Sequence, residues 1–259
     1  MMRLPPQFLC RPIAHRGYHD DRAGRPENSL AAVRAAVARG YGVELDVQLS
    51  RDGRAMVFHD YHLSRLTGCQ GTVRQTDAQV LSGTVLGASA ETIPTLAQAL
   101  EAIAGRVPIL IEIKDQDGAL GPSVGPLERA VADALAGYGG DVAVMSFNPH
   151  SVAAMRTLAP TVPRGLATER FTGNEWRLVP EERRAALREI PDFDAIGAGF
   201  VSHRLQDLPD PRVRELRRRG WPVLCWTVRS RRQERIARQH ADNITFEGYA
   251  AEPRVAPAP

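Results

Sequence analysis

The chain has 259 residues, of which 43% are hydrophobic and 24% charged, as in an ordinary soluble globular protein. The net charge is only +3, and the densest basic stretch, 212–220, has the spacing of a solvated helix face, so nucleic-acid binding is not predicted. No apolar run approaches the ~20 residues of a transmembrane segment, and the proline-broken N-terminus does not resemble a secretory signal. Three distant cysteines predict reduced thiols and a cytoplasmic location, whereas the oligomeric state is not indicated.

Short apolar runs typical of buried strands alternate along the chain with amphipathic stretches typical of helices. The eight runs are residues 11–17, 41–47, 54–60, 108–114, 141–147, 163–168, 194–201 and 222–228. Asn28 is expected to cap a first, Ala-rich helix that runs to Arg39 and stops at Gly40. Further helices are predicted over 94–104, 125–137, 149–158, 180–189, 209–219 and 230–239. Eight such units in a chain of this length predict an α/β fold of the TIM (β/α)8 barrel type.

One step departs from this alternation. Between the second and third runs lies only QLSRDGR (48–54), which is too short for a crossover helix. Either the two strands form a hairpin around Asp52–Gly53, or an extended segment returns along the outside of an irregular barrel. Residues 63–93 lack apolar periodicity and are expected to form a small insertion beside the active face. The whole chain, 1–259, is predicted to be a single domain with its core at about 11–250 and a disordered tail at 251–259.

Ionisable residues end each of the first four runs. Barrel enzymes place their chemistry at the carboxyl ends of the strands. Four adjacent strands with charged ends therefore indicate a functional site rather than ordinary surface charges that keep the protein soluble. These residues are His15 and Arg16 on the first run, Glu44 and Asp46 on the second, His59 and Asp60 on the third, and Glu112 and Lys114 on the fourth.

The three carboxylates of Glu44, Asp46 and Glu112 would repel one another unless they were protonated or bridged by a cation. A site made only of oxygen ligands suits Mg²⁺ or Ca²⁺ better than Zn²⁺. Arg16 and Lys114 would remain beside that ion as binding groups for an anion such as a phosphate ester. Lys114 is the only lysine, and the alternative for it is a structural ion pair with Glu112 at the strand end.

His15 and His59 add two imidazoles, whose ordinary pKa near 6.5 suits an acid and a base. A metal, an anion-binding pair and two histidines together fit the cleavage of a phosphodiester. Trp226 is a candidate wall of the pocket, although it could equally be part of the barrel packing.

The sequence strings themselves resemble those of the glycerophosphodiester phosphodiesterase family. The matching strings occur in the order of the family from residue 14 to about 228, and the combination of His-Arg-Gly, Glu-x-Asp-Val and Phe-His-Asp is specific to it. They are AHRG (14–17), PENS (26–29), ELDVQLSRDG (44–53), VFHDYHLSRLTG (57–68), IPTLAQAL (93–100), IEIK (111–114), SFNP (146–149) and WTV (226–228).

This resemblance implies a TIM barrel with a small insertion after the third strand, one divalent metal (Mg²⁺ or Ca²⁺) and a small glycerophosphodiester as substrate. It implies a route in which the glycerol 2-hydroxyl attacks phosphorus and expels the alcohol, after which a cyclic phosphate is hydrolysed to glycerol 3-phosphate. The implied site residues are Glu44, Asp46 and Glu112 for the metal, His15 and His59 as general acid and base, and Arg16 and Lys114 for the phosphate.

Two strings depart from the family pattern. The family usually has Asn after Trp-Thr-Val, where this chain has Arg229, and it usually ends with Ile-Thr-Asp, where this chain has NITFEG (243–248). These departures bear on the choice of substrate more than on the chemistry. The alternative substrate is a lysophospholipid or another lipid, against which the few large apolar residues of the insertion argue.

Overall fold

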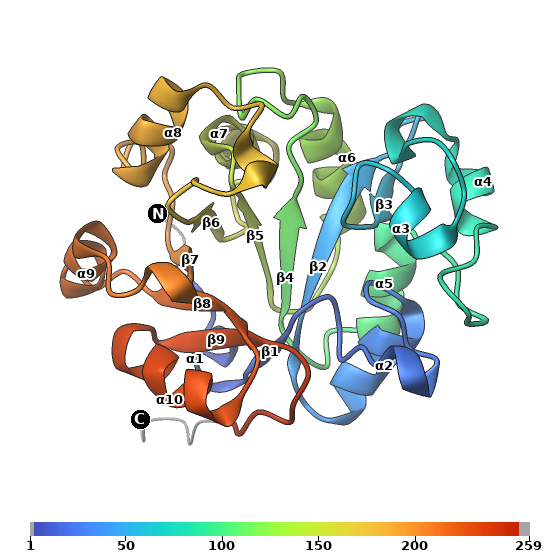
Figure 1. The fold of residues 1–259 in the computed structure, drawn as a ribbon, viewed down its shortest axis with the longest axis horizontal. Helices are drawn as coiled ribbons and strands as arrows, with labels where there is room; N and C mark the ends of the chain where they lie inside the picture. The colour runs from blue at the N-terminus through green and yellow to red at the C-terminus, as the bar shows by residue number, and fades with distance from the viewer. Residues whose placement is uncertain (1–2, 254–259) are drawn as a thin grey trace.

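A computed structural model describes residues 3–253 and shows a closed barrel of eight parallel strands wrapped by helices (Figure 1). The strand order is β1-β9-β8-β7-β6-β5-β4-β2, and pairing of β1 with β2 closes the barrel, which confirms the predicted TIM fold. The barrel strands are β1 (Ile13–Ala14), β2 (Gly42–Leu49), β4 (Ile109–Ile113), β5 (Val142–Ser146), β6 (Arg164–Thr168), β7 (Val201–Arg204), β8 (Val223–Val228) and β9 (Asn243–Phe246).

The seven predicted helices are all present and cover the outside of the barrel (Figure 1). They are α2 (Leu30–Ala38), α5 (Leu96–Ile103), α6 (Pro126–Leu135), α7 (Pro149–Leu158), α8 (Glu181–Arg188), α9 (Pro211–Arg218) and α10 (Arg231–His240). The shorter helical segments are α1 (Gln7–Cys10), α3 (Ser64–Thr67), α4 (Ala78–Ser82), η1 (Asp21–Ala23), η2 (Val73–Gln75), η3 (Asn174–Trp176) and η4 (Leu205–Asp207). No helix among residues 3–253 is long and apolar enough to cross a membrane.

Two strand predictions were wrong in detail. The run 54–60 is not a barrel strand, because β3 (Ala55–Val57) pairs antiparallel with β2 in the hairpin that was one of the two alternatives. The eighth barrel strand is instead β9, which the list of apolar runs missed because its Asn and Thr interrupt the apolar pattern. Of the run 194–201, only Val201 belongs to a strand.

The alternation of side chains along β2 places the site. Val43, Leu45 and Val47 pack into the core between barrel and helices, whereas Glu44 and Asp46 alternate with them and face the barrel interior. The interior is apolar lower down, where Leu110 of β4 clusters with Ala143, Ala167, Leu224 and Phe8. The charged groups therefore lie above an apolar base, at the carboxyl ends of the strands.

The predicted insertion and tail have definite structure in the described residues. Residues 63–93 contain α3, η2 and α4 and pack a small apolar core against Met56 and Phe58. Residues 254–259 of the predicted tail lie outside the described part of the chain. The prediction of disorder begins too early, because Ala251 is buried and its carbonyl oxygen accepts a hydrogen bond from the Tyr41 hydroxyl at 2.9 Å.

Candidate active site

Three buried carboxylates form the centre of the site. Glu44 and Asp46 share the inward face of β2, and Glu112 of β4 is the register partner of Asp46. Glu44 and Asp46 are each 1% exposed and Glu112 is 8% exposed. One oxygen from each lies within 4.8 Å of the other two, so the predicted metal ligands do converge.

The electrostatics of this cluster fit a hard cation. Burial and the neighbouring charges of Asp46 and Glu112 raise the pKa of Glu44 well above its usual range. The Oε1 atom of Glu44 is buried and has no hydrogen-bond partner among the described residues. An orphaned carboxylate oxygen beside two further carboxylates is the arrangement that an oxygen-coordinated divalent ion would satisfy.

Lys114 contacts the other two carboxylates of the cluster. Its Nζ lies 2.7 Å from Asp46 Oδ1 and 2.5 Å from Glu112 Oε1. Burial lowers the pKa of Lys114, but the charges of Asp46 and Glu112 outweigh it, so the pKa is raised and the ammonium stays protonated. The ion pair with Glu112 that was the alternative explanation is therefore present, and it extends to Asp46.

Arg16 is folded back into the site by a left-handed turn. Arg16 has φ 54° and Gly17 has φ 78°, and a Cβ at Gly17 would come within 2.8 Å of the Ala32 Cβ. The backbone N–H of Arg16 donates to Glu44 Oε2 at 2.9 Å. Its guanidinium donates to Glu27 at 2.7 Å and lies 3.2 Å from Asp46 Oδ2. The conformation explains why the string needs glycine directly after the arginine.

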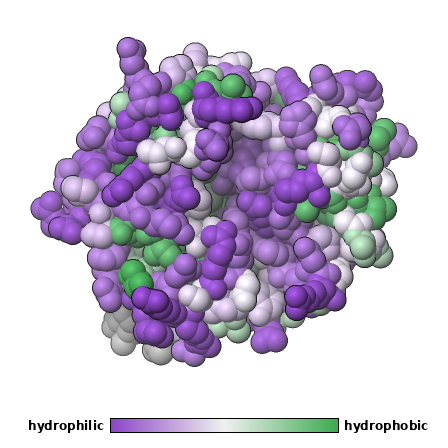
Figure 2. Space-filling model, viewed as in Figure 1, coloured by the Kyte–Doolittle hydropathy of each residue, from purple (hydrophilic) through white to green (hydrophobic). Residues whose placement is uncertain are grey.

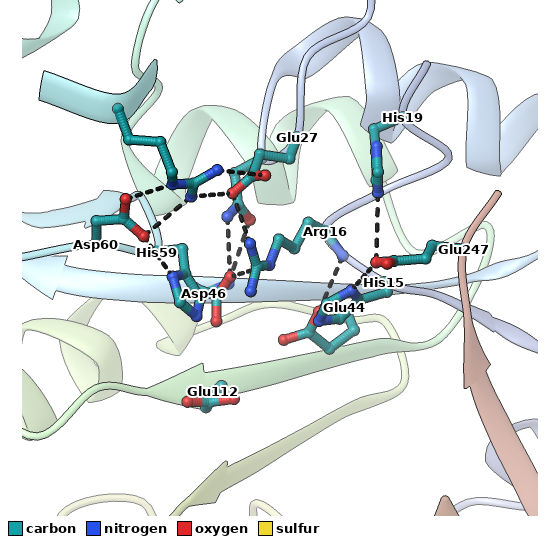
Figure 3. A network of polar contacts seen from close by, with 12 residues as sticks. His15, Arg16, His19, Glu27, Glu44, Asp46, His59, Asp60, Glu112 and Glu247 are labelled. Atoms are coloured by element: carbon teal, nitrogen blue, oxygen red, sulfur yellow. Dashed lines mark hydrogen bonds and ion pairs between the residues drawn. The ribbon is translucent and has the colours of Figure 1, made fainter. Parts of the chain in front are cut away.

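The two histidines flank the carboxylates, and each is bonded to a carboxylate of its own (Figure 3). His15 Nδ1 lies 2.5 Å from Glu247, and its Nε2 lies 4.0 Å from Glu44. His59 Nδ1 lies 2.6 Å from Asp60. Burial lowers the pKa of His15, and the hydrogen bond to Glu247 opposes this shift. Each ring therefore meets its carboxylate through Nδ1, and Nε2 lies on the other edge of the ring.

Several site residues were missed or misassigned from the sequence. Asn28 is not the cap of α2, because the Ser29 hydroxyl accepts the Ala32 N–H in that role. Asn28 has φ 60°, and its side-chain amide donates to Asp46 at 2.9 Å. The sequence signal that could have indicated a site role for Asn28 was its position in the PENS string. The resemblance had placed that string in the family without giving any of its residues a role.

A network of ion pairs connects Asp60, the partner of His59, to Arg16. Arg65, from the insertion, donates to Asp60 at 2.5 Å and to Glu27 at 2.7 Å, and Glu27 in turn accepts from Arg16. Burial opposes ionisation of Asp60, but His59 and Arg65 hold its pKa far below its usual range. Asp60 therefore contacts His59 and Arg65 as a carboxylate. Arg65 lies in the matched string 57–68, but no role for it was apparent from the sequence, because its partner Glu27 is 38 residues away along the chain.

Trp226 lies in an aromatic group on the other side of the barrel mouth. Its ring N–H donates to the Ser202 carbonyl at 3.0 Å, and its ring meets that of Phe147 edge-on with centroids 5.5 Å apart. Phe147 also packs against Trp176 at 5.0 Å. A role for Trp226 as a wall of the substrate pocket stays a prediction.

A hollow opens in the face of the molecule seen in Figure 2, and hydrophilic residues dominate its walls. Beside Lys114 lies a cavity of about 260 Å³, bounded by Gln116 and Arg74 and by the start of α6. Of the predicted site residues only Lys114 lines this cavity, which therefore lies beside the carboxylate cluster rather than within it.

The fold and the site together are those of a TIM-barrel enzyme, with buried ionisable groups gathered at the carboxyl ends of its first strands. The model of the glycerophosphoryl diester phosphodiesterase family matches residues 15–245. The chain belongs to this family, and its enzyme class is that of the phosphoric diester hydrolases.

Relatives and solved structures agree with this assignment. A glycerophosphodiester phosphodiesterase of Caldanaerobacter subterraneus is 29% identical over 245 residues, covering 90% of this chain and 91% of that protein. A probable glycerophosphodiester phosphodiesterase of Mycobacterium tuberculosis is 30% identical, covering 83% of this chain and 78% of its own length. The structure of an Oleispira antarctica phosphodiesterase in complex with the product sn-glycerol-3-phosphate matches with a TM-score of 0.75 and 26% identity, over 93% of each chain.

Proposed function

We propose that the protein hydrolyses glycerophosphodiesters to glycerol 3-phosphate and an alcohol, with one divalent metal and two histidines. The observation that carries this proposal is the buried cluster of three carboxylates flanked by two imidazoles, each with its Nδ1 bonded to a carboxylate. The product named for the Oleispira antarctica structure supports glycerol 3-phosphate as the product here.

The charge of the site supports a phosphodiester as the ligand. Glu44, Asp46 and Glu112 supply three negative charges when ionised, whereas Arg16 and Lys114 supply two positive charges, which leaves one net negative charge. A divalent ion would convert this sum to one net positive charge, the complement of a phosphodiester monoanion. Mg²⁺ or Ca²⁺ held by the three carboxylates would polarise the phosphoryl oxygens and stabilise the negative charge that develops on them.

The side chains of this chain supply binding and proton transfer. Arg16 presents a planar guanidinium and Lys114 a compact ammonium, and both bind phosphoryl oxygens in the proposed complex. One imidazole takes the proton of the attacking hydroxyl at Nε2. The other gives a proton from Nε2 to the oxygen of the departing alcohol. Asp60 holds the ring of His59 in place for this transfer.

A soluble diester fits the site better than a lipid. The hollow in Figure 2 is hydrophilic, and the exposed large apolar residues of the insertion region are only Tyr61, Val80 and Val85. The cysteines Cys10, Cys69 and Cys225 are free thiols, which supports the proposed cytoplasmic location.

Metal removal tests the proposal directly. We expect a chelator to abolish hydrolysis of glycerophosphodiesters, and added Mg²⁺ or Ca²⁺ to restore it. The assay compares several glycerophosphodiesters, a lysolipid and bis(p-nitrophenyl) phosphate, with and without each metal. Full activity in chelator would refute the metal, and a clear preference for the lysolipid would refute the soluble substrate.

Replacement of the solitary lysine tests its proposed contact with phosphate. Lys114→Arg keeps the charge but replaces a point charge with a larger planar group between Asp46 and Glu112. We expect turnover to fall about tenfold or more while the variant folds normally, since a misplaced binding group of this kind costs at least ~1.4 kcal/mol. Wild-type turnover in steady-state assays would show that an ammonium is not required at this position.

A further inference from the structure

We propose that Glu247 and Arg229 are positioning residues for His15: Arg229 fixes the carboxylate of Glu247, and Glu247 fixes Nδ1 of His15 so that Nε2 faces the reacting atoms. This inference rests on the proposed role of His15 in proton transfer. It adds residues that follow the last two barrel strands, β8 and β9, to a site whose other residues come from the first strands of the chain.

The strand order brings the three residues together. β9 lies between β1 and β8 in the barrel, and His15, Glu247 and Arg229 each directly follow one of these three strands. The backbone N–H of His15 donates to the Phe246 carbonyl at 2.9 Å, and that of Glu247 donates to the Val228 carbonyl at 3.0 Å. The backbone thus fixes all three positions relative to one another.

The two oxygens of Glu247 have different partners. Oε2 lies 2.5 Å from His15 Nδ1 and 3.6 Å from His19 Nε2, and Figure 3 shows both rings turned toward it. Oε1 accepts a hydrogen bond from Arg229 Nε at 2.7 Å. Burial opposes ionisation of Glu247, but the hydrogen bond from His15 and the nearby ring of His19 lower its pKa far below the usual range. Glu247 therefore accepts from His15 as a carboxylate.

The contact also explains why the chain departs from the family pattern at two places. Arg229 stands where the family usually has Asn, and Phe246 stands where it usually has Asp. Phe246 packs its ring against Tyr41 at 4.8 Å, and the carboxylate follows one residue later at Glu247. Arg229, the first departure, pairs with this carboxylate, which directly follows the second departure, so the two changes lie in a single structural unit.

A second metal site is the competing explanation, because His15, His19 and Glu247 offer three possible ligand atoms within 4.8 Å of one another. The distance between His15 Nδ1 and Glu247 Oε2 is 2.5 Å, which is a hydrogen-bond separation. Two atoms bound to one ion at ~2.0–2.2 Å each, with tetrahedral angles, would be farther apart. The geometry favours a proton between these atoms.

The consequence for catalysis is a fixed tautomer. A carboxylate at Nδ1 keeps the neutral ring protonated there, which leaves Nε2 free to accept a proton and stabilises the ring when it carries the charge. Loss of such a partner of a functional imidazole typically costs about 10–100-fold in activity. Arg229, which is about half exposed, acts only through Glu247.

The test combines activity with a direct observation of the ring. We expect Glu247→Gln to lower kcat about 10–100-fold with little change in KM. The ¹⁵N NMR signals of His15 should show a proton on Nδ1 in the wild type and a mixture of tautomers in the variant. Arg229→Ala should lower kcat by a few-fold in the wild type and have no further effect in the Glu247→Gln background. Arg231→Ala is the matched control, since Arg231 is equally exposed but pairs with Glu252.

The outcomes separate this inference from the proposed function. Wild-type kcat and wild-type His15 signals in a folded Glu247→Gln variant would overturn it. If that variant fails to fold, Arg229→Ala provides the test, and unchanged kcat and unchanged His15 signals in it would overturn the role of Arg229. Glu247→Asp then tests the pairing. If the effects of Arg229→Ala and Glu247→Asp on kcat add in the double variant, the pairing is overturned. The proposed function fails separately if His15→Ala keeps full activity.

Discussion

Glu44→Gln is expected to reduce hydrolysis by about a thousandfold or more while raising the melting temperature of the metal-free protein. Burial raises the pKa of Glu44, and repulsion by the charges of Asp46 and Glu112 raises it further, so its charged form is disfavoured in the folded state. Neutral glutamine removes that repulsion, and ~1 kcal/mol gained would raise the melting temperature by about 2–4 °C. The same change removes a ligand from a cation whose stabilisation of charge is worth several kcal/mol.

The measurements are kcat and thermal unfolding with and without Mg²⁺ or Ca²⁺. Binding of an ion to the folded protein raises the melting temperature, so we expect this rise in the wild type but not in Glu44→Gln. Glu234→Gln is the matched control, because Glu234 is also buried but pairs with Arg238 on α10. That variant should melt lower yet keep its activity and its response to metal. Activity or a metal response retained in Glu44→Gln would remove Glu44 from the metal site.

The sequence was informative where burial forces an unusual pattern. An apolar strand that carries Glu44 and Asp46 two residues apart must bury both, and the cost of that burial indicates a functional site. The same holds for Glu112 and Lys114. The alternation of strands and helices likewise predicted the barrel, because every parallel strand needs a covering helix. These features are local, so they can be read along the chain.

The parts that could not be predicted depend on contacts across the fold. Glu247 meets His15 over 232 positions of sequence, and Arg65 meets Glu27 over 38. Asn28 resembled a helix cap because Asn is common there, and only its left-handed backbone turns the amide to Asp46. β9 was not among the predicted strands, because a short strand between two partner strands needs no long apolar run. Such features require the strand order of the closed barrel.

Replacing each histidine separately should show which one is the acid. We expect His15→Ala and His59→Ala each to lower hydrolysis of glycerophosphocholine about 10²–10⁴-fold. The 4-nitrophenyl ester of glycerol 3-phosphate has a leaving group that departs without a proton, so loss of the general acid matters little for it. His59 is more exposed than His15, at 33% against 13% of the side chain, and we therefore assign to His59 the proton given to the leaving alcohol. His15 lies 4.0 Å from Glu44, beside the proposed metal.

His59→Ala should therefore recover most of its activity on the nitrophenyl ester, whereas His15→Ala should stay inactive on both substrates. His62→Ala is the control, because His62 is exposed and lies three residues from His59, and it should behave as the wild type. Recovery of His15→Ala in place of His59→Ala would reverse the assignment of acid and base. In the proposed mechanism one imidazole protonates the leaving alcohol and the other activates the attacking hydroxyl. An acidic leaving group removes only the need for protonation, so only one variant should recover. Recovery of both variants, or of neither, would contradict this mechanism.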